Sequence, residues 1–278
     1  MKNLFDAHTH LNYDEMTKEE RLTLANEINE SDIAFLIDVG DSVETSMQAI
    51  ADAEDYPWCY AAVGIHPEFA SKYTDADLDK IRELAKHPEV KAIGEIGLDF
   101  YYGKDNQAEQ VELFRKQIRL ANELRMPIMI HTRDANQLTM DILAEEGAFT
   151  DERKSWFPKR PGPKGELVDD ARVQLHCYSG SADLAKQYVK LGATISLGGP
   201  VTFKNGKKAA EVAQRIPAEF LLSETDAPYM APEPLRGRPN KPHYVEHVVR
   251  KMAELKGLSY EGMSKILLEN GKRFFNID

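Results

Sequence analysis

The chain has 278 residues, of which 42% are hydrophobic and 29% charged, and 46 acidic against 35 basic side chains give a formal net charge of −11. This composition is typical of a globular protein and excludes a surface that is basic throughout, although it allows a local basic site. Two cysteines exclude a disulfide framework, and no run of about 18 apolar residues predicts a membrane helix. Because no signal-peptide pattern opens the chain either, we expect a cytoplasmic protein.

Eight short apolar runs recur along the chain and predict parallel strands that are buried on both faces, because they lack apolar–polar alternation. They cover Leu4–His8, Ile33–Val39, Cys59–Ile65, Lys91–Ile96, Pro127–His131, Val173–Cys177, Ala193–Leu197 and Phe220–Glu224. Amphipathic segments separate them, so we predict a single α/β domain over residues 1–278, a (β/α)8 TIM barrel. A doubly wound open sheet is the alternative, but no Gly-x-Gly-x-x-Gly turn follows the first run.

Polar residues mark the expected beginnings of the helices. Thr17 is followed three residues later by Glu20, which predicts a capping box. Asn106 and Ser181 precede two further amphipathic segments, and we expect each of their side chains to cap a helix.

One segment interrupts the alternation of strands and helices. About 25 residues separate the helix predicted over 134–146 from the strand that begins near Val173, and helix-to-strand links are usually much shorter. We interpret residues 148–172 as an inserted loop. Since it joins a helix end to a strand beginning, it belongs on the face opposite the C-terminal strand ends.

Imidazole and carboxylate side chains gather where the predicted strands end, which is the rim where barrel enzymes carry out their chemistry. They are His8, His10, Glu95, His131, His176 and Asp226. This set of donors suits zinc, manganese or iron. Six groups exceed what one tetrahedral ion needs, so two ions that share a carboxylate are the simplest interpretation.

Each residue taken alone has a simpler explanation. His66, after the third strand, resembles a hydrogen-bonded core histidine, and Glu95 alone could belong to a structural ion pair. Cys177 follows a predicted ligand, so its side chain should point away from the site into the core. The metal interpretation depends on the coincidence at five strand ends.

Taken together, these patterns resemble the TatD family of metal-dependent hydrolases, within the amidohydrolase-like superfamily. The resemblance extends from Phe5 to about Phe275. It includes the Asp-x-His-x-His opening, GIHP, GEIGLDFYY, HTRDA, HCYSG, GPVTFKN, ETDAPY and RGRPN. Two parts fit less well, namely the long segment 148–172 and the closing Asn270–Phe274.

The resemblance implies a TIM barrel that binds two divalent ions, zinc, magnesium or manganese. It implies one ion held by His8, His10, Glu95 and Asp226, and another held by Glu95, His131 and His176. It further implies that His66 lies beside the substrate phosphate, that Glu224 supports the metal site, and that Asp226 accepts a proton from water. The implied activity is that of a deoxyribonuclease, typically a 3′–5′ exonuclease acting on single-stranded DNA or 3′ ends. No membrane partner is expected, and a monomer is favoured.

An acidic chain needs local positive charge to bind DNA. The loops at the predicted rim carry Arg133, Lys204, Lys207, Lys208, Arg236, Arg238 and Lys241. Because arginine binds a phosphate with two donors, we expect Arg236 and Arg238 to be the direct contacts. Tyr101, Tyr102 and Phe203 could stack on bases, although packing is the simpler interpretation. The alternative is that the cations are ordinary solubilising charges.

Two other functions compete with nuclease activity. An amidohydrolase or lactonase would share the barrel and cleave a C–N or C–O bond of a small molecule. Many such enzymes bridge their metals with a carboxylated lysine at the end of the fourth strand. Here Glu95 occupies that end and Lys91 the opposite one. A metal-stabilised binding protein would hold metal without turnover.

Overall fold

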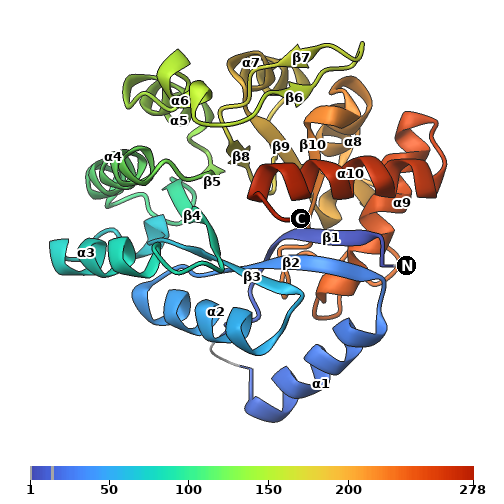
Figure 1. Cartoon of the computed structure of the whole chain (residues 1–278), viewed down its shortest axis with the longest axis horizontal. Coiled ribbons are helices and arrows are strands. Elements are labelled where there is room, and N and C mark those ends of the chain that lie inside the picture. Colours follow the sequence, from blue (N-terminus) through green and yellow to red (C-terminus); the bar gives the residue numbers. More distant parts are fainter. Residues whose placement is uncertain (1, 14–15) are drawn as a thin grey trace.

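The computed structural model describes residues 2–13 and 16–278, and eight parallel strands in this part of the chain curl into a nearly closed barrel (Figure 1). Their order around the barrel is β1-β2-β3-β4-β5-β8-β9-β10, so each barrel strand lies beside its predecessor. Their bounds are Leu4–Thr9, Ile33–Val39, Cys59–Val63, Val90–Asp99, Ile128–Arg133, Val173–Leu175, Thr194–Leu197 and Leu221–Ser223. The predicted TIM barrel is confirmed, because an open doubly wound sheet would reverse its strand order midway.

Helices alternate with the strands and surround the barrel (Figure 1). The α-helices are α1 (Lys18–Glu30), α2 (Val43–Asp55), α3 (Asp75–Leu84), α4 (Gln107–Leu124), α5 (Asn136–Glu145), α6 (Asp151–Ser155), α7 (Ala182–Leu191), α8 (Lys207–Arg215), α9 (Val245–Lys256) and α10 (Tyr260–Phe275). Short 3-10 helices cover Pro67–Phe69, Gly199–Thr202, Ala218–Phe220 and Pro242–Tyr244. Among the described residues, no helix is both long and apolar enough to cross a bilayer.

The strands are buried on both faces, which explains why their sequences read as continuous apolar runs. All six residues of β1 are buried, as are all four of β9. One face of each strand fills the barrel interior and the other packs against the helices. Polar residues inside a strand, such as Asp6 and His8, are therefore the ones that need a specific explanation.

The helix caps agree with the sequence in two of three cases. Thr17 forms the predicted capping box with Glu20, and the hydroxyl of Ser181 accepts the N–H of Leu184. The prediction that Asn106 caps α4 is wrong. Its side-chain oxygen accepts instead from Gln110 (2.8 Å), so it is not available to the first turn of the helix.

The barrel closes between its first and last strands through few contacts. Thr9 and Ala227 form an isolated parallel bridge. The N–H of His10 donates to the carbonyl of Ala227 (2.8 Å), and the N–H of Asp226 donates to the carbonyl of His8 (2.9 Å). This closure brings the histidines at the end of β1 beside the aspartate that follows β10.

Residues 148–172 form α6 and a hairpin of β6 (Arg160–Pro161) and β7 (Leu167–Val168) that cover the face where the barrel strands begin. Arg153 is fully buried and donates to the carbonyls of Ala171 and Met126, each at 2.9 Å. Arg160, also fully buried, donates to the carbonyl of Ala193 (2.9 Å). These carbonyls lie just before β8, β5 and β9, which is the face opposite the C-terminal strand ends.

Arg153 supplies the hydrogen bonds that attach α6 to the barrel, and its removal should destabilise the fold. Arg153→Ala leaves three acceptors without a donor, the two carbonyls and the side-chain oxygen of Asn122. We expect the free energy of unfolding, measured by urea denaturation, to fall by about 3 kcal/mol. Lys159→Ala is the control, because Lys159 and its partner Asp169 are mostly exposed, and it should cost less than about 0.5 kcal/mol. Equal effects of the two variants would contradict this role.

Candidate metal centre

The six predicted ligand side chains converge at the C-terminal ends of the barrel strands, and all are buried or half-buried. They come from β1, β4 and β5 and from the residues that follow β1, β8 and β10. The donor atoms of these six residues and of His66 form three overlapping groups, in each of which all atoms lie within 4.8 Å of one another. These groups are His8, Glu95 and His176; His8, His10 and Asp226; and His66, Glu95 and His131.

The carboxylate of Glu95 lies at the middle of the cluster, and its two oxygens face different histidines. Oε2 is 3.4 Å from Nε2 of His8 and 3.9 Å from Nε2 of His10. Oε1 is 2.6 Å from Nδ1 of His131 and 2.8 Å from Nε2 of His176. One oxygen is therefore directed at each of the two ligand groups that the family resemblance implies.

The backbone of β4 brings Glu95 into this position. The pairing of β4 with β5 shifts register between Ile93 and Ile96, and such irregularities re-aim the side chains beside them. Gly97 then lets the two strands approach closely, because a Cβ there would lie 1.9 Å from the carbonyl oxygen of His131. Glycine is required at that position for the ligand on β5 to lie beside the ligand on β4.

The hydrogen bonds of His8 and His10 test whether these residues fit a metal ion. Nδ1 of His8 lies 3.0 Å from the sulfur of Met129, and Nδ1 of His10 lies 2.8 Å from the carbonyl oxygen of Val39. Both partners only accept, so each Nδ1 carries the proton and each Nε2 presents a lone pair. The two Nε2 atoms face each other at 3.2 Å. In neutral rings the two lone pairs repel unless a cation, either a proton or a metal ion, lies beside them, so the donor set fits a divalent metal ion.

The charges of the cluster lead to the same conclusion. Burial raises the pKa of Glu95, but the imidazoles of His176 and His8 outweigh this effect and hold the pKa well below its usual range. Burial likewise opposes the ionisation of Asp226, but the hydrogen bond with His10 and the charges of the neighbouring imidazoles together outweigh it, so the pKa of Asp226 is lowered. Burial lowers the pKa of His10, yet Asp226 raises it to about 9, so without a metal ion Nε2 of His10 also carries a proton at neutral pH, and a divalent ion would replace that proton. Both carboxylates are thus ionised at neutral pH and need positive charge beside them.

Asp99 is a functional candidate that our sequence analysis missed. Its Oδ2 lies 3.2 Å from Nε2 of His131, the nitrogen that faces away from Glu95. Burial raises the pKa of Asp99, but bonds from His131 and from two backbone N–H groups outweigh it and lower the pKa to about 2. A carboxylate on the outer nitrogen of a ligand histidine fixes its tautomer and orientation. Asp99 follows Glu95 by four residues on one strand, and residues an even number apart point to the same side. This spacing could have predicted that Asp99 lies near the metal centre.

Glu224 lies behind His176, as the family resemblance implies. It is fully buried, accepts from the hydroxyl of Ser196 (2.5 Å) and from the N–H of Cys177, and lies 3.6 Å from Nδ1 of His176. The prediction that Cys177 is a core cysteine is wrong. Because β8 ends at Leu175, strand alternation no longer applies there, and Cys177 is half-buried with a φ of 41°.

His66 lies at the edge of the cluster with the opposite tautomer to His8 and His10. Its Nδ1 accepts the backbone N–H of Glu68 (3.2 Å), so the proton is on Nε2. That nitrogen is 3.8 Å from Oε1 of Glu95. Burial lowers the pKa of His66 to about 3, so the ring is neutral at pH 7. A neutral imidazole whose N–H is directed into the site can donate a hydrogen bond. A metal ligand would need a nitrogen without a proton at that position.

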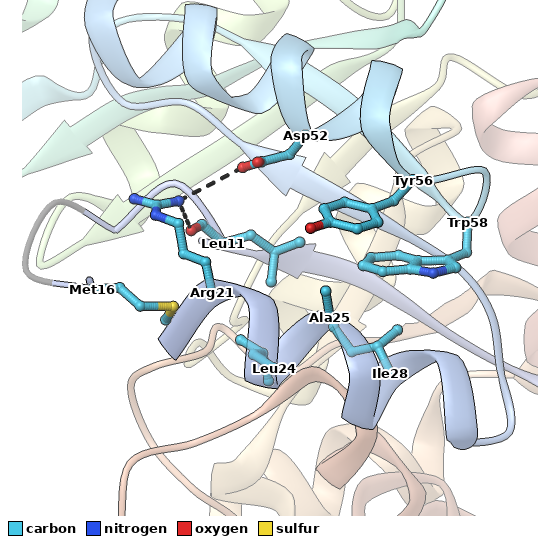
Figure 2. A pocket seen from close by; sticks show the side chains of 9 residues that line it. All are labelled: Leu11, Met16, Arg21, Leu24, Ala25, Ile28, Asp52, Tyr56 and Trp58. Carbon is cyan, nitrogen blue, oxygen red and sulfur yellow. Dashed lines mark hydrogen bonds and ion pairs between the residues drawn. The ribbon is translucent and has the colours of Figure 1, made fainter. Parts of the chain in front are cut away.

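The segment that follows His10 is held in place from two sides. Figure 2 shows the side chain of Arg21 directed at the carbonyl of Leu11, to which it donates a hydrogen bond. The same guanidinium nitrogen lies 3.7 Å from Oδ2 of Asp52. On the other side Asp38 accepts the N–H of Leu11 (2.8 Å). The cavity that Leu11, Arg21 and Asp52 help to line measures only about 10 Å³, so the segment after His10 packs closely on α1 and α2.

The two arginines predicted to contact phosphate, Arg236 and Arg238, lie in the loop after β10, as does Lys241, whereas Lys207 and Lys208 begin α8 and Arg133 ends β5. Arg236 is exposed and its guanidinium lies 4.2 Å from the centre of the Phe203 ring. Arg238 is exposed and forms no ion pair with any residue that the structure describes. Lys241 instead binds Glu27 at 2.5 Å, so its charge is already compensated. Of these three cations, the two arginines are the ones available to an anionic ligand.

Comparison with known proteins gives a consistent picture. The profile of the family described as "TatD related DNase" matches residues 5–276. A Bacillus subtilis protein named uncharacterized metal-dependent hydrolase YabD is 40% identical over 275 residues, covering 99% of this chain and 100% of its own. The 3′-5′ ssDNA/RNA exonuclease TatD of Escherichia fergusonii is 32% identical over 279 residues, covering 99% of each chain. The crystal structure of YjjV, a TatD homolog from Escherichia coli K12, superposes with a TM-score of 0.84 at 26% identity, covering 100% of this chain and 99% of its own.

The central position of Glu95 leads to a test of metal content. Glu95→Ala removes a donor from both ligand groups at once, so it should lose more bound metal than His131→Ala or His176→Ala. Metal per chain is measured by mass spectrometry after equilibration at one fixed zinc concentration. The control is Glu145→Ala, a mostly exposed glutamate on α5, which should bind as the wild type does. A Glu95→Ala protein with wild-type metal content would show that Glu95 does not bridge.

Proposed function

The chain belongs to the family of TatD-related DNases, and from that premise we propose that it is a 3′–5′ exodeoxyribonuclease that degrades single-stranded DNA with two divalent ions. Family membership makes it a metal-dependent hydrolase that acts on ester bonds. The single observation that supports the two-ion proposal is the carboxylate of Glu95, whose oxygens face two different sets of imidazoles.

We assign the ligands according to those two sets. His8, His10, Glu95 and Asp226 would hold one ion, and Glu95, His131 and His176 would hold the other. Zinc, magnesium and manganese are the candidate metals, with imidazole favouring zinc. When bound, such a pair of ions activates water and offsets the negative charge of a phosphodiester.

The other residues orient these ligands or act on the substrate. Asp226 is ionised at neutral pH, so its carboxylate can accept the proton that the attacking water loses. The Nε2–H of His66 is free to donate to a phosphate oxygen of the substrate. Glu224 and Asp99 lie behind His176 and His131 and keep their rings in the orientation that directs a bare nitrogen at Glu95.

The substrate proposal combines the rim charges with the names of relatives. Relatives at 30–32% identity are named 3′-5′ ssDNA/RNA exonucleases. The net charge of −11 makes long-range attraction of a polyanion weak, so nearby cations must bind the strand. The exposed Arg236 and Arg238 supply two such groups at the loop after β10.

An amidohydrolase or lactonase acting on a small molecule remains the rival. Enzymes of that kind often bridge their metals with a carboxylated lysine, and Glu95 occupies the corresponding strand end. Lys91 lies at the other end of β4, where its ammonium group donates to the carbonyl of Pro88 (2.8 Å). The position of Lys91 thus favours the nuclease.

Metal removal tests the proposed function directly. The protein stripped with a chelator should not degrade a 5′-labelled single-stranded oligonucleotide, and added Zn²⁺, Mg²⁺ or Mn²⁺ should restore stepwise shortening from the 3′ end. We expect a loss of at least about a hundredfold, or about 2.7 kcal/mol of barrier, because the residues that the structure describes offer no other activated nucleophile. Hydantoin and lactone panels serve as the comparison. Turnover of those compounds without any cleavage of DNA would favour the rival, and undiminished cleavage by metal-free protein would exclude the two-ion mechanism.

The arginine pair leads to a separate prediction about salt. Arg236→Ala combined with Arg238→Ala should raise KM for an oligonucleotide and flatten the plot of log affinity against log salt by roughly 0.7 for each lost phosphate contact. Metal content should not change. The matched control combines Arg82→Ala and Arg119→Ala, which removes the same charge from α3 and α4, where each arginine is paired with a glutamate. If both double variants behave alike, the loop after β10 does not bind the strand.

A further inference from the structure

Two tyrosines and an arginine form an exposed cluster beside the metal centre, which we call the aromatic platform and define as Tyr101, Tyr102 and Arg133. The rings of Tyr101 and Tyr102 are 48% and 76% exposed. They meet edge to face with their centres 4.8 Å apart. The guanidinium of Arg133 lies 4.0 Å from the centre of the first ring and 4.7 Å from that of the second. Large aromatic rings left open to solvent in this way are typical of binding surfaces.

The platform lies at the ends of the two strands that carry central ligands. Tyr101 and Tyr102 follow β4, which bears Glu95, and Arg133 ends β5, two residues beyond His131. Side chains two apart on a strand point to the same side, so Arg133 and His131 share a direction. Asp99 on β4 pairs with Arg133 on β5, so the two tyrosines and Arg133 follow from the same level of the barrel rim.

Asp99 connects the platform to the centre. Its Oδ1 accepts the backbone N–H groups of Tyr101 (2.9 Å) and Tyr102 (2.8 Å), while its Oδ2 lies 3.2 Å from Nε2 of His131. Asp99 is only 4% exposed, so water competes little for these bonds. A single carboxylate therefore fixes the tyrosine-bearing loop and a proposed ligand relative to each other.

We propose that the aromatic platform binds an unpaired nucleobase of the nucleotide next to the cleaved phosphodiester, an inference that rests on the proposed nuclease function. The guanidinium of Arg133 lies over both rings and is closer to Tyr101, and Tyr102 is the more exposed of the two tyrosines and takes the base. Stacking uses the π-face that every base possesses, so the platform binds without sequence preference. A base inside a duplex is stacked on both sides and is held by its pairing partner, so it must be unpaired and unstacked before it can reach Tyr102, and the platform therefore favours single strands.

The test compares binding of two strands to metal-loaded protein. The probe is a short fluorescein-labelled oligothymidylate whose last linkages are phosphorothioates, which slows hydrolysis, and its partner is the same strand with abasic residues at the last two positions. Fluorescence anisotropy gives Kd. We expect the wild type to bind the intact strand about tenfold more tightly than the abasic strand. Tyr102→Ala should reduce this difference to less than twofold, whereas Tyr102→Phe, which keeps the ring, should retain it.

Tyr260→Ala is the matched control. Tyr260 has the same type of contact, with the guanidinium of Arg250 4.1 Å from its ring centre, but it begins α10, away from the metal centre. This variant should keep the tenfold difference. A base-dependent difference that persists in Tyr102→Ala, or that is absent from the wild type, would overturn the platform assignment.

The outcome separates this inference from the proposed function. If the wild-type protein cleaves the unmodified strand but Tyr102→Ala still distinguishes intact from abasic ends, only the platform assignment is wrong. If the metal-loaded wild type cleaves no strand, the nuclease function itself is wrong.

Discussion

A buried carboxylate surrounded by imidazoles is the interaction on which the rest of this structure depends. Glu95 is 4% exposed and ionised, and an uncompensated charge at such a depth would be costly. To compensate this charge, histidines from β1, from β5 and from the residue after β8 must lie at the same level of the barrel as Glu95. A closed barrel of parallel strands does this, because all of its strands end at the same rim.

Three of the four proposed ligand histidines have a hydrogen-bond partner on the outer nitrogen, and the fourth, His176, has a carboxylate 3.6 Å from it. His8 has the sulfur of Met129, His10 the carbonyl of Val39 and His131 the carboxylate of Asp99. Glu224 lies behind His176. These partners belong to the strands or to the residues that directly follow them, so the bare nitrogens are oriented before any ligand arrives. Such preorganisation reduces the reorganisation needed during catalysis.

The two ends of the barrel have different tasks. At the end where the strands begin, the buried Arg153 and Arg160 donate to backbone carbonyls and attach residues 148–172 as a cover. At the other end, arginines rest on aromatic rings and remain exposed, as Arg133 and Arg236 show. The buried Arg160 also lies over a ring, that of Phe220, so the difference is in the N–H groups: those bound to carbonyls stabilise the fold, whereas those of an exposed arginine that contacts only a ring stay available for a phosphate.

The sequence by itself determined the eight strands, the TIM barrel and the group of residues at its rim, because apolar runs and strand-end positions depend on neighbours in the chain. It failed at Asn106 and at Cys177, where a contact with Gln110 and an early strand end override the local pattern. Only the tertiary structure decided which nitrogen of each histidine faces Glu95, that Lys241 is compensated by Glu27, and that Asp99 joins His131 to the tyrosine loop. Those features depend on side-chain directions and on partners from distant segments. They are fixed only when the barrel closes and brings β1 against the segment that follows β10.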